Sequence, residues 1–355
     1  MIGVITAGLV APTTLLVPNA PTIGTATGGS GQASVTFTPA ATGPAATSYT
    51  AVSSPGGITK TGASSPLVVT GLTNGTAYTF TVYATNAYGN SASSAASNSV
   101  TPAIVTPPVS GYKVWLDATD SSKITASSGS VSQWTDGSAN AYAFTQATSS
   151  YQPTTGTRSI NGLNALDFDG TSDWLYSTAA ISTWKFLHST TSTIFVVMQA
   201  DVTDTYMTTV STEAGSTSRV GFNNPLQSGA VIDAICDKGS AGSGVYDANS
   251  GVSYNTSAMY VTYKSDPANG TAASRIQISK NGGSYGGGNT LSNSPSTADS
   301  ENSLTIGCNL DLYNGTRYPG SWFNGLVGEI LIYDSALSSG DITSVQSYLS
   351  TKWGI

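Results

Sequence analysis

The stretch that decides the fold of the first part of the chain is GTAYTFTVYATNAYG, residues 75–89. Apolar and polar residues alternate in it, so that one face of an extended chain carries Tyr78, Phe80, Val82 and Ala84. Alternation with period two over this length predicts a half-buried β-strand. Similar short runs precede it, such as ASVTFTP, SYTAV and PLVVTGL, and they are separated by clusters of Gly, Pro, Asn and Ser. Regularly spaced short strands with such turns predict a sandwich of antiparallel sheets.

The longer run GLTNGTAYTFTVYATNAYGNSASS resembles the late strands of fibronectin type III domains. Leu72 precedes the turn, Tyr78 takes the tyrosine-corner position, and a turn runs from Asn86 to Gly89. A buried phenol needs a hydrogen bond, so the corner is expected to pin the loop before its strand. Phe37 stands where the family usually has Trp. The resemblance implies an immunoglobulin-like sandwich over residues 18–102.

The remainder, residues 112–355, resembles the laminin-G-like branch of the concanavalin superfamily. The segments that carry the resemblance occur in the order of that family: YKVWLDATD, VSQWTDGS, NALDFDGTSDWLYS, TSTIFVVMQA and the terminal FNGLVGEILIYDSALSSGDITSVQSYLSTKWGI. It implies a concanavalin A-like jelly roll, with two antiparallel sheets packed face to face. The expected fold class is therefore all-β, an immunoglobulin-like sandwich followed by a jelly-roll sandwich with a short C-terminal helix.

The terminal block predicts its own structure without the resemblance. Leu326, Ile330 and Ile332 alternate as in a strand, and Ser338 can cap a following helix with Asp341 three residues later. Trp353 is expected to anchor the chain end in a core. The apolar stripe of this helix is expected at Ile342, Val345, Tyr348 and Leu349.

Charge divides the chain into two parts. Up to Ser110 the only formally charged side chain is Lys60, while every Asp and Glu lies at Asp117 or beyond. The Pro-containing segment AIVTPPVSG, residues 103–111, is predicted to be an extended linker. Residues 1–17 are apolar, but they lack the basic start of a signal peptide and are interrupted by Pro12. This segment is therefore expected to be an arm that docks on a neighbouring chain, with a packed N-terminal strand as the alternative.

Composition excludes several classes of function. The net charge is −7 and the 12 basic residues are scattered, so nucleic acid is not an expected partner. No apolar run reaches the length that spans a bilayer, so membrane insertion is not expected. Cys236 and Cys308 match no metal-ligand spacing and are expected to be buried free thiols, with a disulfide as the alternative.

No catalytic constellation is predicted, and the chain is not expected to be an enzyme. Glucanases on a concanavalin fold use two carboxylates on one strand. The nearest pair here, Asp167 and Asp169, lies in a part of the family pattern that looks structural. The single histidine, His188, stands before an apolar strand without a nucleophile motif.

Metal and glycan sites are the binding hypotheses. No cofactor is expected. The resemblance implies that calcium is possible, because laminin-G-like and pentraxin-like proteins often carry it at a sheet edge, and a hard cation needs several oxygen ligands. Sugar rings stack on aromatic faces while polar side chains bind the hydroxyls, with packing roles as the alternative. The metal candidates are Asp117, Asp120, Asp136, Asp169, Asp173 and Asp311, for which solvated turn aspartates are the default interpretation. The glycan candidates are Tyr313, Asn314, Arg317, Tyr318, Trp322, Trp134 and Trp174.

The pairing of an immunoglobulin-like sandwich with a laminin-G-like module resembles that of accessory and adsorption proteins of phage particles. With the nearly uncharged first domain, this resemblance implies a structural protein of a bacteriophage virion surface, a capsid decoration, head-fibre or tail component. Its arm and first domain would contact other virion proteins, and the jelly roll would bind a host glycan. Low charge in the first domain favours a homo-oligomer, with a trimer as one candidate. The alternative is a secreted bacterial adhesin or a carbohydrate-binding accessory module of an extracellular enzyme.

Overall fold

The computed structural model describes residues 16–203, 206–213, 220–227, 229–238, 246–247, 251–286, 296–300, 302–313 and 316–355. The chain divides into two compact units, Met1–Ala103 and Ile104–Ile355. The division falls at the start of the predicted linker. Most of this linker belongs to the second unit, because the backbone oxygens of Val105 and Val109 each lie 2.9 Å from a hydroxyl of that unit, those of Tyr348 and Tyr333.

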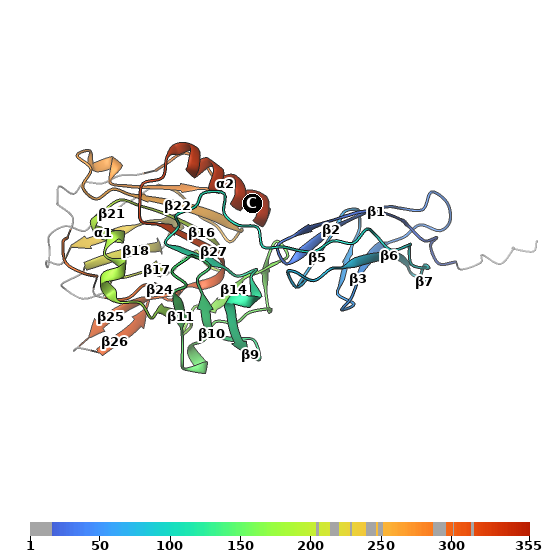
Figure 1. Cartoon of the computed structure of the whole chain (residues 1–355), viewed down its shortest axis with the longest axis horizontal. Helices are drawn as coiled ribbons and strands as arrows, with labels where there is room; N and C mark the ends of the chain where they lie inside the picture. Colours follow the sequence, from blue (N-terminus) through green and yellow to red (C-terminus); the bar gives the residue numbers. More distant parts are fainter. Residues whose placement is uncertain are drawn as a thin grey trace, which may run out of the picture. The chain divides into compact units, whose positions relative to one another are not determined.

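The first unit is a seven-stranded sandwich of two antiparallel sheets. Its strands are short and end at turns, as the sequence pattern predicts (Figure 1). One sheet has the order β1 (Thr22–Gly29), β2 (Gln32–Thr38), β5 (Leu67–Thr70), and the other has the order β4 (Thr59–Gly62), β3 (Ser48–Ser54), β6 (Thr79–Asn86), β7 (Gly89–Asn90).

The alternation in β6 is confirmed. Phe80, Val82 and Ala84 are buried, and with Tyr78 they face a core that also holds Phe37. The hydroxyl of Tyr78 accepts a hydrogen bond from the backbone N–H of Thr73 at 3.1 Å, so the predicted pinning of the preceding loop is confirmed as well.

The open edge of β6 is covered by a segment that forms no regular strand, residues 91–97, here called the serine edge. Three serines spaced three residues apart make the same contacts: the backbone N–H donates to a carbonyl of β6, and the hydroxyl accepts from the N–H of that same β6 residue. The pairs are Ser91 with Ala84 (2.8 and 2.9 Å), Ser94 with Val82 (2.8 and 2.9 Å) and Ser97 with Phe80 (2.8 and 3.0 Å).

The second unit packs a ten-stranded sheet against a six-stranded sheet, and both are antiparallel. The larger has the order β21 (Tyr246–Asp247), β20 (Ile235–Lys238), β18 (Val220–Gln227), β17 (Met207–Ser211), β24 (Thr305–Ile306), β15 (Leu175–Ser177), β11 (Ala143–Thr145), β10 (Ser130–Thr135), β9 (Ile124–Ser127), with β19 (Val231–Ile232) beside β18. The smaller has the order β14 (Leu166–Asp169), β27 (Asn324–Tyr333), β16 (Ser192–Ala200), β22 (Met259–Ser265), β23 (Ile276–Lys280), with β8 (Val114–Asp117) also on β27.

Smaller elements complete this unit. They are the strand pairs β12 (Ser159–Ile160) with β13 (Leu163–Asn164) and β25 (Asn309–Tyr313) with β26 (Thr316–Gly320), the helices α1 (Phe186–Ser189) and α2 (Ser339–Trp353), and 3-10 turns at Ser121–Lys123, Ser149–Tyr151, Ile181–Trp184 and Ala272–Ser274.

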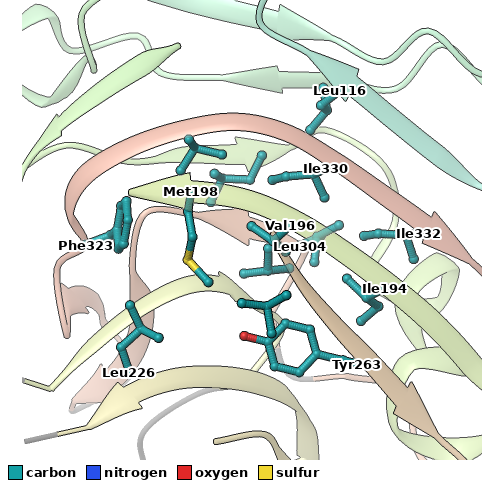
Figure 2. Packing of buried hydrophobic residues seen from close by; sticks show 14 of the residues in the cluster. Leu116, Ile194, Val196, Met198, Leu226, Tyr263, Leu304, Phe323, Ile330 and Ile332 are labelled. Atoms are coloured by element: carbon teal, nitrogen blue, oxygen red, sulfur yellow. The ribbon is translucent and has the colours of Figure 1, made fainter. Parts of the chain in front are cut away.

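The main core fills the space between the two sheets. Ile194, Val196 and Met198 of β16 point into it together with Ile330 and Ile332 of β27 (Figure 2). Alternate residues of the same strands face the other way, toward α2. The six-stranded sheet is therefore buried on both faces, which explains why IFVVM, residues 194–198, is continuously apolar.

Helix α2 covers the outer face of the six-stranded sheet (Figure 1). Ser338 caps it by accepting a hydrogen bond from the Asp341 N–H, and the predicted stripe packs with Trp353 against Phe195, Val197 and Leu331. The predicted fold class is thus confirmed: an all-β chain with an immunoglobulin-like sandwich first and a larger jelly-roll sandwich with a short C-terminal helix second.

Candidate functional site

Four of the predicted metal ligands are buried in the second unit, and three of them, Asp117, Asp120 and Asp136, each have their own hydrogen-bond partners. Asp117 pairs with the Lys352 ammonium at 2.7 Å. The Asp120 carboxylate accepts from the N–H and hydroxyl of Ser122, at 3.1 and 2.6 Å. Asp136 accepts from the Trp115 N–H at 2.6 Å and from other donors of its own turn. These aspartates are neither solvated turn residues nor parts of one site.

Asp169 and Asp173 lie together in the turn that follows β14. Burial would raise the pKa of Asp169, but hydrogen bonds from Thr171 and Ser172 outweigh it and lower the pKa to about 2. Burial, followed by the charge of Asp169, raises the pKa of Asp173 to about 7. The Asp173 carboxyl accepts from the Asp169 N–H at 3.1 Å. The two carboxyl groups are therefore expected to carry one negative charge between them below neutral pH.

Over the part of the chain that the structure describes, no three His, Cys, Asp or Glu side chains gather to hold a metal ion. The side chain of the sixth metal candidate, Asp311, lies outside the described residues. The calcium hypothesis therefore gains no observation in its favour from the described residues.

The glycan candidates are placed as follows. Trp134 is fully buried in the main core, so it is a packing residue, and its ring is not accessible to a sugar. Trp174 and Trp322 are half-buried. The side chains of Tyr313, Arg317 and Tyr318 and the whole of Asn314 fall outside the described residues, so their assignment stays a prediction.

Trp174 belongs to an aromatic and polar surface on the ten-stranded sheet. Trp174 and Tyr176 are two residues apart along one strand, so both point away from the core while Leu175 points into it. Their ring centroids are 5.4 Å apart. Tyr151 lies next to them, since its carbonyl accepts from the Trp174 N–H at 3.1 Å, and 43% of its surface is exposed.

Polar side chains extend this surface across the neighbouring strands. Tyr176 of β15 is paired with Thr145 of β11, and Thr145 is paired with Gln133 of β10. Residues paired across strands share a face of the sheet. Both polar residues are half-buried, and the Gln133 amide donates to the Thr135 hydroxyl at 2.8 Å. We call this surface, made of Gln133, Thr135, Thr145, Trp174 and Tyr176, the β10–β11–β15 face.

Trp174 is the one residue of this face that the sequence analysis predicts. The spacing of Trp174 and Tyr176 on either side of the buried Leu175 is a local signal that also points to Tyr176. Gln133 and Thr145 could not be found from sequence, because their place beside Tyr176 depends on pairing between strands that are distant along the chain.

His188 and the cysteines are internal. His188 lies in α1, its ring Nε2 is 3.1 Å from the Ala298 carbonyl, and burial lowers its pKa. The lowered pKa favours the neutral ring, and His188 lies just before the apolar strand β16, where the sequence places it. Cys236 and Cys308 are buried and are not joined in a disulfide, which confirms the prediction of buried thiols and excludes the disulfide alternative.

Comparison with known proteins gives only distant likenesses. No family model and no curated protein matches the sequence. A CBM40 of Ruminococcus gnavus IT-sialidase bound to alpha2,3 sialyllactose aligns at 12% identity over 51% of this chain and 95% of its own, with a TM-score of 0.38. The binding domain of botulinum neurotoxin DC in complex with rat synaptotagmin II aligns at 13% identity over 67% of this chain and 52% of its own, with a TM-score of 0.40.

A Trypanosoma rangeli sialidase in complex with 2,3-difluorosialic acid aligns at 10% identity over 90% of this chain and 49% of its own, with a TM-score of 0.45. The chain thus spans about half the length of the neurotoxin and sialidase structures. Among the described helices, none is long and apolar enough to cross a membrane.

Proposed function

We propose that this chain is a non-catalytic binding protein that holds a glycan on the β10–β11–β15 face. The observation that carries the proposal is the Trp174–Tyr176 ring pair, half-exposed on a sheet surface beside the exposed ring of Tyr151. Aromatic rings on a rigid strand present flat apolar faces of the kind on which sugar rings stack. The neighbouring Gln133 and Thr145 supply an amide and a hydroxyl for the sugar hydroxyls.

The biological setting that we propose is a bacteriophage virion surface, with the first unit as the attachment piece. Two observations support this role for the first unit. Lys60 is its only formally charged side chain, and Leu16, Val17 and Tyr88 expose apolar surface near one another. The Asn86 amide donates to the Leu16 carbonyl at 3.1 Å, which holds residues 16 and 17 at the β6–β7 turn. A charge-poor apolar end favours contact with other virion proteins or with further copies of this chain.

Glycan binding is tested with the full chain on a panel of immobilised bacterial surface glycans. Trp174→Ala should weaken binding of any retained glycan about five- to thirtyfold, since one stacked ring contributes on the order of 1–2 kcal/mol. Tyr88→Ala is the matched control, because it removes an exposed aromatic ring from the other unit and should leave binding unchanged. Equal affinity of both variants and the wild type would contradict the assignment of the site.

The setting is tested separately from the site. Mass spectrometry and electron microscopy of purified phage particles should find this chain on the particle surface. Its absence from particles, together with its recovery from a bacterial culture medium, would favour the alternative of a secreted adhesin or a carbohydrate-binding accessory module.

A further inference from the structure

Three charged side chains meet inside the second unit, each from a different element. They are Asp117 of β8, Glu329 of β27 and Lys352 of α2, and their side chains are 3%, 0% and 3% exposed. The Lys352 Nζ lies 2.7 Å from the Asp117 Oδ2 and 2.9 Å from the Glu329 Oε2. Asp117 and Glu329 are also direct partners in the β8–β27 pairing. Burying two carboxylates with one ammonium is costly in a low-dielectric interior, which favours any reaction that removes the charges.

The two oxygens of Asp117 have different surroundings. Oδ1 accepts hydrogen bonds from the backbone N–H of Thr119 at 2.9 Å and from the Thr119 hydroxyl at 2.8 Å. Oδ2 faces the Lys352 Nζ. Two fixed donors on one oxygen polarise the carboxyl carbon, and they would stabilise the negative charge that develops on that oxygen if a nucleophile added to the carbon.

Glu329 is held in position to move a proton. Its Oε1 accepts from the Trp115 Nε1 at 2.8 Å and from the Tyr348 hydroxyl at 2.7 Å. Its Oε2 accepts from the Trp353 Nε1 at 2.7 Å and contacts the Lys352 ammonium. Burial raises the pKa of Glu329, against the opposing effect of Lys352, which makes this carboxylate a better proton acceptor than an exposed one.

We propose that Lys352 and Asp117 condense within the folded chain to form an isopeptide bond. A proton passes from the Lys352 ammonium to the Asp117 carboxylate, with Glu329 as the proton carrier, so that neutral Nζ faces a neutral carboxylic acid. Nζ adds to the Asp117 Cγ, the charge develops on Oδ1, and Oδ2 leaves as water. One N–C bond forms, one C–O bond breaks, and the ammonium and carboxylate become an amide plus water without any oxidant or co-reactant.

The resting state before reaction is the ion pair. Burial alone would lower the pKa of Lys352, but Glu329 and Asp117 together raise it, so the amine is protonated until the proton transfer occurs. The reaction therefore depends on the completed fold, because the three groups come from elements that are far apart in sequence. The product would link β8 to the C-terminal helix across 235 residues of chain.

The intact mass of the purified full chain tests the proposal. The wild type should be lighter than its sequence mass by about 18 Da, the mass of one water. Trypsin cuts after Lys113, Lys123 and Arg317, so the link should appear as peptide 114–123 joined to peptide 318–355, with no cut after Lys352. A wild-type chain with its full sequence mass and ordinary cleavage after Lys352 would overturn the proposal.

Two variants separate the chemistry from the packing. Lys352→Arg keeps a cation but cannot form the amide, and Glu329→Gln keeps the side-chain shape without the proton acceptor. Both should show the full mass of their own sequences. Lys113→Arg is the matched control, because Lys113 lies 3.5 Å from Asp334 in an exposed ion pair, and this variant should keep the loss of about 18 Da. Loss of water in Lys352→Arg would also contradict the assignment, and the wild-type mass decides even if a variant does not fold.

Discussion

Asp173 shows how a single side chain couples this fold to pH. Its pKa is raised to about 7, mainly by burial, whereas a carboxyl group in an unfolded chain has a pKa near 4. The folded chain then holds a proton that the unfolded chain has lost. The contribution of Asp173 to the free energy of unfolding is therefore largest at acidic pH. This contribution falls as the pH rises from about 4 to 7 and changes little above pH 7.

We expect the wild type to lose about 1–2 kcal/mol of stability relative to Asp173→Asn between pH 5 and 8, a value reduced for solvent screening at this turn. Asn keeps an oxygen that can accept from the Asp169 N–H but does not titrate. Urea unfolding of both proteins at several pH values measures the difference. Parallel pH profiles would show that Asp173 ionises normally in the folded chain.

At the scale of one element, the serine edge replaces a regular strand. A regular strand at this place would expose a row of unpaired backbone N–H and C=O groups on its outer side. In residues 91–97, each of the three serines instead bonds β6 through its backbone N–H and its hydroxyl. Ser94→Ala removes the hydroxyl that accepts from the buried Val82 N–H. We expect a loss of about 1–2 kcal/mol, since an unpaired buried donor keeps its desolvation cost.

Ser93 provides the matched control for this element. Ser93 is the same residue type as Ser94 and lies next to it, but it is exposed, so Ser93→Ala should change the free energy of unfolding by less than about 0.5 kcal/mol. Denaturant unfolding of the two variants separates a specific contact from a general preference for serine. Equal effects of the two substitutions would contradict the role of the hydroxyls.

The same elements show what could be predicted from sequence. The faces of β6 and α2 follow from local periodicity and from the Ser338 cap, and both are confirmed. The serine edge was not predicted from the sequence, because a serine at every third position in a segment of Ala and Ser looks like a turn-rich loop. Asp117 was misread as a turn or metal aspartate, because its partner Lys352 is 235 residues away and only the completed fold brings them together.

At the scale of the whole molecule, each unit has a core of its own. Two tyrosines offer a matched test of independence, because each is buried and bonds one backbone group within its own unit. The Tyr78 hydroxyl accepts from the Thr73 N–H in the first unit, and the Tyr333 hydroxyl donates to the Val109 carbonyl in the second. Replacing either by Phe removes one oxygen and leaves the ring packing in place.

We expect calorimetry of the full chain to show two unfolding transitions, and each Phe variant to lower only one of them. A loss of about 1 kcal/mol should shift the transition of the smaller unit by about 4–8 °C and that of the larger by about 2–4 °C, because the entropy of unfolding grows with chain length. A single transition that moves with both substitutions would mean that the units unfold together. In that case the charge difference between the units would not support separate roles in attachment and recognition, because neither unit would keep its fold without the other.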